Sequence, residues 1–280
     1  MFLLEITNVL LSLIFCVLVS IVYFYILFLI FIAKKVSLKP DLKLIYCRFV
    51  AEIFFHFVVV LNKLYSIVGL VSTTMFVKNL IFYLIWLSLV MGTIKTTIVF
   101  FITIDRVFAF FSPIFYHKHR NKISMYLVLF FISLFVFFDQ FMLFGYCGNV
   151  IDVPVNCENF QCTVNQCYLQ YWMVHEQVVF FVISSLSTIL FVRLFVCNFL
   201  VFNQSSKLIS KATQIALLDC IIIIIFNFLP VLVLAYFPSI NLKTGITAIP
   251  RTGGSLFESI IIFRIIARQK SVAPTFVSPV

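Results

Sequence analysis

Seven long runs of apolar residues, separated by short polar gaps, divide this sequence. A helix needs about 20 residues to cross roughly 30 Å of hydrocarbon at 1.5 Å per residue. Strands are not expected, because lipid offers open strands no hydrogen-bond partners and the alternation of a membrane barrel is missing. The sequence therefore predicts an all-α, seven-transmembrane helix bundle, one domain over residues 1–280, with helices near 9–33, 44–62, 79–104, 123–144, 177–202, 215–237 and 246–266.

The composition excludes a soluble protein. Hydrophobic residues make up 63% of the chain and charged residues 11%, whereas soluble domains are about half apolar and about a quarter charged. The net charge of +10 does not indicate nucleic-acid binding, because Lys and Arg lie in gaps between apolar runs rather than on one solvated face. The first run lacks a basic start and a cleavage site, so we expect a retained helix in the lipid bilayer.

The stretch "LYSIVGLVSTTMFV", Leu64–Val77, complicates the helix count because it is also apolar. At 14 residues, with Gly69 inside it, it is too short to cross the bilayer. We expect an outer loop or an interfacial segment. If it crossed the membrane, every later helix would be inverted.

The distribution of Lys and Arg predicts the orientation. Cytoplasmic loops collect these residues. Twelve lie on one side of the predicted topology, in the first, third and fifth loops and the C-terminal tail, against three on the other: Lys63, Lys78 and Lys243. We therefore expect the N-terminus outside and the C-terminus in the cytoplasm. The sequon at Asn203 then lies in a cytoplasmic loop and stays unglycosylated.

Four cysteines lie in the long loop before the fifth helix, on the predicted outer side. That compartment is oxidising, so we expect disulfides, and four cysteines allow three pairings. A zinc site is the competing interpretation, but the spacings are wider than those of a Cys-x-x-Cys knuckle. The residues are Cys147, Cys157, Cys162 and Cys167.

Three ionisable residues are predicted at one depth within the membrane. Counting from the cytoplasmic edge at 1.5 Å per residue, Glu52 and Glu258 lie roughly 12 Å deep and Lys95 roughly 14 Å deep. Charges at such depth usually face the bundle interior and find partners. We hypothesise a buried Glu52–Lys95–Glu258 cluster that joins the second, third and seventh helices. The alternative is that water or backbone satisfies each charge separately.

Other polar residues in the runs allow two interpretations each. Arg48, Glu52 and His56 share one helix face, as a structural polar stripe or as a proton relay. Asp139 and Arg251, near the outer ends of the fourth and seventh helices, line an outer pocket or extend to the headgroups.

Pro230 lies in the middle of the sixth predicted helix, two residues after Phe228. It removes one backbone hydrogen bond, so we expect a kink at this point. Such a kink provides a pivot for a conformational change or is only structural, since prolines are frequent in membrane helices.

The stretch "TIDRVFAFFSPIFYHKHR" closes the third predicted helix with adjacent opposite charges. The topology places them at the cytoplasmic end of that helix, where Arg106 can reach across the mouth of the bundle. The pattern of Asp105, Arg106, Ala109, Pro113 and Tyr116 resembles the Asp/Glu-Arg motif and second loop of rhodopsin-like G-protein-coupled receptors.

Within that superfamily, the chain resembles nematode serpentine chemoreceptors of the BC class (Srbc) over nearly its whole length. The resemblance rests on "IDRVFAFFSPIFYHKHR", "CGNVIDVPVNCENFQCTVNQCYLQYW" and "GGSLFESIIIF". It implies a chemosensory receptor in the plasma membrane of sensory neurons, which binds a small-molecule ligand from outside and signals through a heterotrimeric G protein. It further implies that Arg106 restrains the inactive state and then contacts the G protein, with Phe228 and Pro230 at the hinge of the sixth helix.

Several features depart from the wider receptor pattern. Val107 replaces the usual Tyr after Asp-Arg, no Asn-Pro-x-x-Tyr closes the seventh helix, and the fifth helix lacks a proline. These departures put the usual activation pathway and sodium site in doubt. No Cys lies at the outer end of the third helix, so we expect the cysteines of the outer loop to form disulfides with one another.

Other classes of function remain as alternatives. A channel or transporter fits seven helices with buried charges, but inverted repeats and a charged pore ring are missing. A non-signalling receptor-like partner fits the missing motif in the seventh helix. An enzyme is not expected, because "HEQVV" at His175 lacks the second His of a zinc protease. We expect no cofactor or metal.

Overall fold

The computed structural model describes residues 2–33, 43–71, 77–119, 125–154, 157, 160–196, 215, 218, 221–236 and 248–267. These ranges contain helices and turns, with no strand among them. In chain order the helices are α1 (Phe2–Leu27), α2 (Lys43–Val71), α3 (Leu80–Phe111), α4 (Pro113–His119), α5 (Met125–Gln140), α6 (Phe160–Thr163), α7 (Gln166–Val196), α9 (Leu229–Tyr236) and α10 (Ala248–Ala267). Three π-helical segments continue or precede them: η1 (Phe28–Ile32), η5 (Phe141–Tyr146) and η7 (Ile223–Phe228).

Five helices in the described ranges are long and apolar enough to cross a membrane: α1 with η1, α2, α3, α5 with η5, and α7. The two remaining predicted segments also contain helix, namely η7 with α9, and α10. α10 carries three charges, Arg251, Glu258 and Arg264, within 20 residues. The all-α, seven-transmembrane fold class is thereby confirmed.

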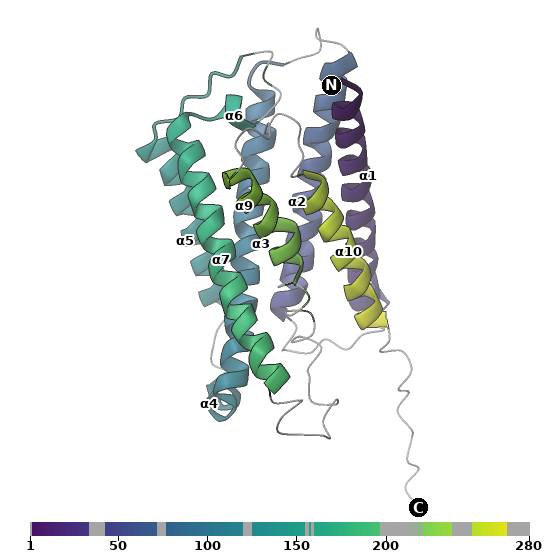
Figure 1. Cartoon of the computed structure of the whole chain (residues 1–280). Coiled ribbons are helices and arrows are strands. Elements are labelled where there is room, and N and C mark those ends of the chain that lie inside the picture. Colours follow the sequence, from purple (N-terminus) through teal and green to yellow (C-terminus); the bar gives the residue numbers. More distant parts are fainter. Residues whose placement is uncertain are drawn as a thin grey trace, which may run out of the picture.

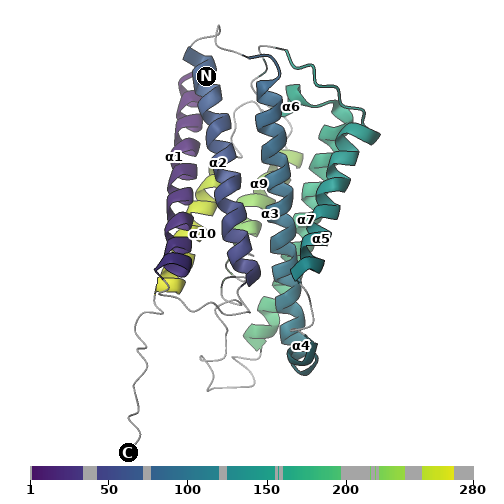
Figure 2. The ribbon, with the colours of Figure 1, turned by 180° about the vertical axis from the view of Figure 1, so that it is seen from behind.

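The helices form one elongated bundle (Figure 1). α1 packs against α2 and α10, and α3 packs against α2, α5 and α7. The view from behind shows α3 between α2 on one side and α5 with α7 on the other (Figure 2). α3 therefore connects the two halves of the bundle.

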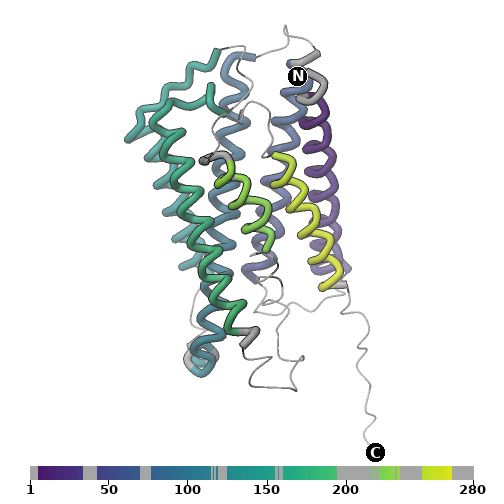
Figure 3. The backbone as a smooth tube through the Cα atoms, in the orientation of Figure 1, coloured from purple at the N-terminus to yellow at the C-terminus, as the bar shows by residue number. Residues whose placement is uncertain are grey.

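The two ends of the bundle carry different features (Figure 3). The start of α1 and α6 lie at one end, which we call the disulfide end because the segment before α7 contains two disulfides. α4 lies at the other end, beside the last turns of α3, and we call it the Arg106 end.

Apolar side chains fill the interior and also cover the outside. Tyr23 and Phe49 are fully buried, with ring centroids 5.3 Å apart, between α1 and α2. On the outer surface, Phe24 is 65% exposed and Phe137 is 70% exposed. Such a surface is stable only where the solvent is itself apolar, as in a bilayer.

Two helices extend further than the sequence analysis expected. α2 continues to Val71, so Leu64 and the residues up to Val71 are helical rather than an outer loop. A single Gly69 costs a helix only about 1 kcal/mol, which is too little to end it. α7 begins at Gln166 rather than near 177, because Tyr168 and Leu169 are buried beneath the loop and extend the helix past the apolar run. Residues 72–76 and 197–202 lie outside the described ranges.

Candidate functional site

Three residues of the Asp-Arg motif form one hydrogen-bonded unit at the Arg106 end. Nη2 of Arg106 lies 2.5 Å from Oδ2 of Asp105. The hydroxyl of Tyr116 donates to Asp105, at 3.0 Å from Oδ1 and 3.1 Å from Oδ2. Arg106 is only 6% exposed. A guanidinium held this way is buried against its own helix end rather than extended into solvent.

The local fold of the following segment returns Tyr116 to Asp105. α3 ends at Ser112, whose φ of −134° is not helical, and Pro113 begins α4. Proline is favoured at the first position of a helix because its φ is already helical and its missing N–H is not needed there. Tyr116 lies one turn into α4 and is buried. The structure thus brings together Asp105, Arg106 and Tyr116, with Pro113 setting the turn between them.

A buried ionic network joins four helices in the middle of the bundle. Nζ of Lys95 on α3 lies 2.9 Å from Oε2 of Glu52 on α2. Arg48 on α2 forms an ion pair with Glu258 on α10, and its Nη2 lies 3.5 Å from Oε1 of Glu52. Tyr23 on α1 donates to Oε1 of Glu258 at 3.4 Å. Two cations and two carboxylates balance, as burial in a low dielectric requires.

This network differs in one connection from the cluster hypothesised above. Glu52 and Lys95 meet, but Glu258 contacts Arg48 and not Lys95. Arg48 is the bridging residue that the depth argument missed, although its i,i+4 spacing to Glu52 was the signal for it. His56 completes the face, with Nδ1 3.4 Å from Oε2 of Glu52.

Two disulfides fix the segment before α7. Cys147 pairs with Cys167, and Cys157 pairs with Cys162. This is one of the three pairings that the sequence left open. Cys147 follows η5 and Cys167 lies in the first turn of α7, so the first disulfide ties α5 to α7.

Hydrogen bonds from Asn79 attach the same loop to α3. Asn79 precedes α3 with φ of 65°, a left-handed conformation that Asn tolerates better than most residues. Its Oδ1 accepts from the Val153 N–H at 2.9 Å, and its Nδ2 donates to the Ile151 carbonyl at 3.4 Å. The loop is therefore held to α3 by an amide, at the end of the helix where the sequence offers no cysteine.

Asp139 and Arg251 both make contacts inside the bundle. The carboxylate of Asp139 is 2% exposed and accepts from Tyr168 and Thr93. Nη2 of Arg251 on α10 lies 2.6 Å from Oε2 of Glu176 on α7. Each side chain thus has partners on a neighbouring helix, which agrees with the interpretation that places them toward the bundle.

Phe228 and Pro230 lie at a change of helix type. The π-helix η7 ends at Phe228, and Pro230 is the second residue of α9. Pro230 has no N–H for the carbonyl four residues earlier, and a π-helical turn is a common way to absorb such a break. The Phe228 ring lies 6.4 Å from that of Phe181 on α7. The sixth helix thus changes register where it contacts α7.

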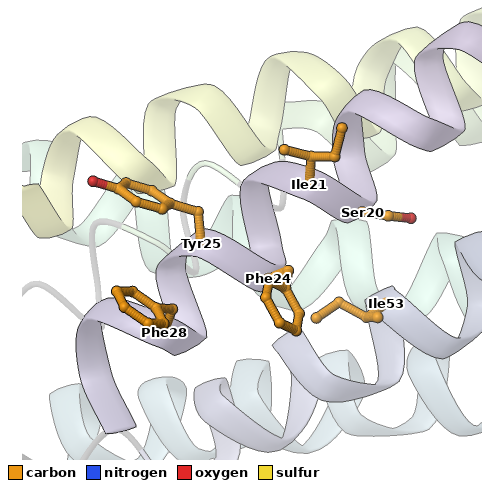
Figure 4. Close-up of a pocket in the computed structure, with 6 residues that line it drawn as sticks. All are labelled: Ser20, Ile21, Phe24, Tyr25, Phe28 and Ile53. Atoms are coloured by element: carbon orange, nitrogen blue, oxygen red, sulfur yellow. The ribbon is translucent and has the colours of Figure 1, made fainter. Parts of the chain in front are cut away.

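A shallow groove on the lipid-facing side of α1 is lined by apolar side chains (Figure 4). Ile21, Phe24 and Phe28 are exposed there, and the Ser20 hydroxyl is already donated to the Cys16 carbonyl at 3.0 Å. The groove therefore offers little to orient a polar ligand. No group of three or more metal-ligating side chains occurs within the ranges that the structure describes.

Comparison with known proteins identifies the family. The model of the serpentine type 7TM GPCR chemoreceptor Srbc family matches residues 1–270, nearly the whole chain. A comparison with curated proteins finds no match. The family match agrees with the all-helical bundle. This multi-pass membrane protein belongs to the Srbc family of serpentine seven-transmembrane chemoreceptors of the G-protein-coupled receptor type.

Proposed function

We propose that this chain is a chemosensory receptor of the plasma membrane of sensory neurons, which binds a small molecule from outside and signals through a heterotrimeric G protein. The disulfide end then faces the exterior and the Arg106 end faces the cytoplasm. The excess of Lys and Arg in the loops assigned to the cytoplasm supports this orientation. Disulfides at the opposite end fit an oxidising exterior.

The observation that carries the proposal is the hydrogen-bonded unit of Asp105, Arg106 and Tyr116 at the Arg106 end. It is a compact arrangement in which a buried guanidinium is held by an adjacent carboxylate. Release of Arg106 from Asp105 would present a cation at the cytoplasmic mouth of the bundle. A G protein that binds the released form better would stabilise it.

The link between the two ends is a rearrangement of helices. A ligand shifts the population only if it binds one arrangement of the bundle better than the other. The ionic network of Arg48, Glu52, Lys95 and Glu258 connects α2, α3 and α10, and Arg48 lies within ion-pair distance of both carboxylates. The register change at Pro230 gives the sixth helix a place to pivot.

The direct test is a chemical library applied to cells that express the chain together with a G-protein dissociation reporter. The proposal predicts that at least one compound causes dissociation of one class of G protein. Silence across the library and across all G-protein classes, with the chain at the cell surface, contradicts it. A ligand-evoked current without any G protein favours the alternative, a channel or transporter.

A further inference from the structure

The Asp139 carboxylate lies where α3, α5 and α7 meet, in the half of the bundle nearer the disulfide end. We propose that Asp139 anchors a binding site for a small organic ammonium ion. The inference rests on the proposed function, because it names the chemical class of the ligand for that receptor. It follows from the burial of Asp139 without a cation among the described residues, from its aromatic surroundings and from one unpaired polar atom beside it.

Only neutral hydroxyl groups surround the Asp139 carboxylate, whose residue is 2% exposed. Tyr168 donates to it at 3.2 and 3.3 Å and Thr93 at 3.4 Å, and the Tyr171 hydroxyl lies beside it. Hydrogen bonds from a hydroxyl to an ionised carboxylate are usually about 2.5–2.7 Å long. Long bonds from neutral donors compensate a buried negative charge only in part.

No described Lys, Arg or His makes an ion pair with Asp139. The other deeply buried carboxylates of the described chain do have cations: Glu52 contacts Lys95, and Glu258 contacts Arg48. His175 is near enough to Asp139 for an electrostatic interaction, but it does not reach ion-pair distance. A cation from outside the chain would complete this site as Lys95 and Arg48 complete the others.

The walls around Asp139 are aromatic. The rings of Tyr168 and Tyr171 lie 5.7 Å apart on one face of α7, and Tyr171 stacks on His175 at 5.6 Å. Trp86 on α3 points to the same helix interface, where its Nε1 donates to Oε1 of Gln140 at 2.5 Å. Aromatic faces attract ammonium ions, most strongly where water is excluded. A carboxylate among aromatic rings is suited to an ammonium and poorly suited to an anion.

One polar atom of this region is buried without a hydrogen-bond partner among the described residues. It is Nε2 of Gln140, the residue that follows Asp139 on α5. Leaving such an atom unpaired is costly. An acceptor oxygen on the ligand, such as a hydroxyl, satisfies it.

The experiment measures thermal unfolding of the purified full-length chain in detergent micelles. The probes are benzylammonium, 2-hydroxyethylammonium and tetramethylammonium, each against a neutral counterpart of similar shape: benzyl alcohol, ethylene glycol and tert-butanol. We expect at least one ammonium probe to raise the unfolding temperature in a saturable manner while its neutral counterpart does not. Equal effects of the paired probes, or no effect of any ammonium probe, overturn the inference.

Two variants locate the site. Asp139→Asn keeps the shape and can still accept from Tyr168, and we expect it to weaken ammonium binding at least tenfold. The matched control is Asp152→Asn, an exposed aspartate of the disulfide end paired with Lys78, which keeps wild-type binding. Unchanged binding in Asp139→Asn overturns the inference.

Tyr171→Phe gives a second test that does not depend on the folding of the Asp139 variant. It removes one hydroxyl beside Asp139 and leaves the carboxylate its bonds from Tyr168 and Thr93, so the fold is expected to persist. Primary ammonium probes should bind several-fold more weakly, whereas tetramethylammonium, which has no N–H, should bind as before. Equal changes for both kinds of probe contradict the site. Because no G protein takes part, these results are independent of whether the receptor signals through one.

Discussion

Lys95 on α3 places its ammonium 2.9 Å from the carboxylate of Glu52 on α2, deep within the predicted membrane span of both helices. The Lys95 side chain is 22% exposed and also lies over the ring of Phe55, with Nζ 4.9 Å from the ring centroid. This contact is one half of a network whose other half is Arg48 with Glu258. Each half is neutral by itself.

The first prediction concerns this neutrality. Glu52→Gln or Lys95→Met alone leaves an uncompensated buried charge, which typically costs about 3–5 kcal/mol. The double variant removes one charge of each sign and leaves Arg48 paired with Glu258. Its free energy of unfolding should therefore be about 2 kcal/mol or more higher than that of the less stable single variant. Thermal unfolding of the purified proteins in detergent measures the difference. Single variants as stable as wild type would show that the pair is not coupled.

A second prediction follows from the hydroxyl of Tyr116. Tyr116→Phe removes a hydrogen bond to the charged Asp105, worth about 1.5–3 kcal/mol, and so weakens the unit that holds Arg106. If that unit favours the inactive state, signalling without ligand rises about tenfold, since 1.4 kcal/mol corresponds to a factor of ten. A G-protein dissociation reporter, normalised to surface expression, measures it. Tyr83→Phe, at an exposed position of α3, is the control, and equal basal signalling in both variants contradicts the role of Tyr116.

The two disulfides should differ in their contribution to stability. Cys147 and Cys167 are separated by 20 residues, and Cys157 and Cys162 by 5. The loop-closure relation gives about 3 kcal/mol for the longer loop and about 2 kcal/mol for the shorter one. Replacing Cys147 and Cys167 together by Ala should therefore lower the unfolding temperature more than replacing Cys157 and Cys162. The reverse order would mean that the tie between α5 and α7 is dispensable.

Asn79 adopts a left-handed backbone conformation, and its side chain holds the loop by hydrogen bonds. Two substitutions separate these roles. Asn79→Gly keeps the backbone conformation but removes the bonds to Val153 and Ile151, at a cost of about 1–2 kcal/mol. Asn79→Ala adds the strain of a positive φ, about 1 kcal/mol more. Thermal unfolding of both variants tests this order. Equal stability of both with wild type would show that the loop is not held at Asn79.

Much of the fold follows from the sequence because the bilayer acts on each helix separately. The apolar runs predicted all seven helical segments, since their length and hydropathy are local properties. The ends of α2 and α7 were not predictable in the same way. α7 starts at Gln166 because Tyr168 is buried under the loop, a tertiary contact that no local pattern encodes.

The candidate site likewise has features that the sequence predicted and features that depend on tertiary contacts. Counting residues placed Glu52 and Lys95 at one depth, and they meet in the structure. Depth does not say which helices face each other, so it could not show that Glu258 pairs with Arg48. The pairing of Cys147 with Cys167 likewise depends on the path of the loop in space. The coordination of Asp139 depends on Tyr168 from another helix, so the sequence alone left it undecided.

The most direct test of the account is to label the two ends of α3 from outside intact cells. Lys78→Cys lies just before α3 at the disulfide end, and Ser112→Cys follows α3 at the Arg106 end; both native side chains are exposed. A membrane-impermeant maleimide should label the cysteine at 78 in intact cells and the cysteine at 112 only after permeabilisation. Labelling of the cysteine at 112 in intact cells would place Arg106 outside and contradict the coupling of this end to a G protein.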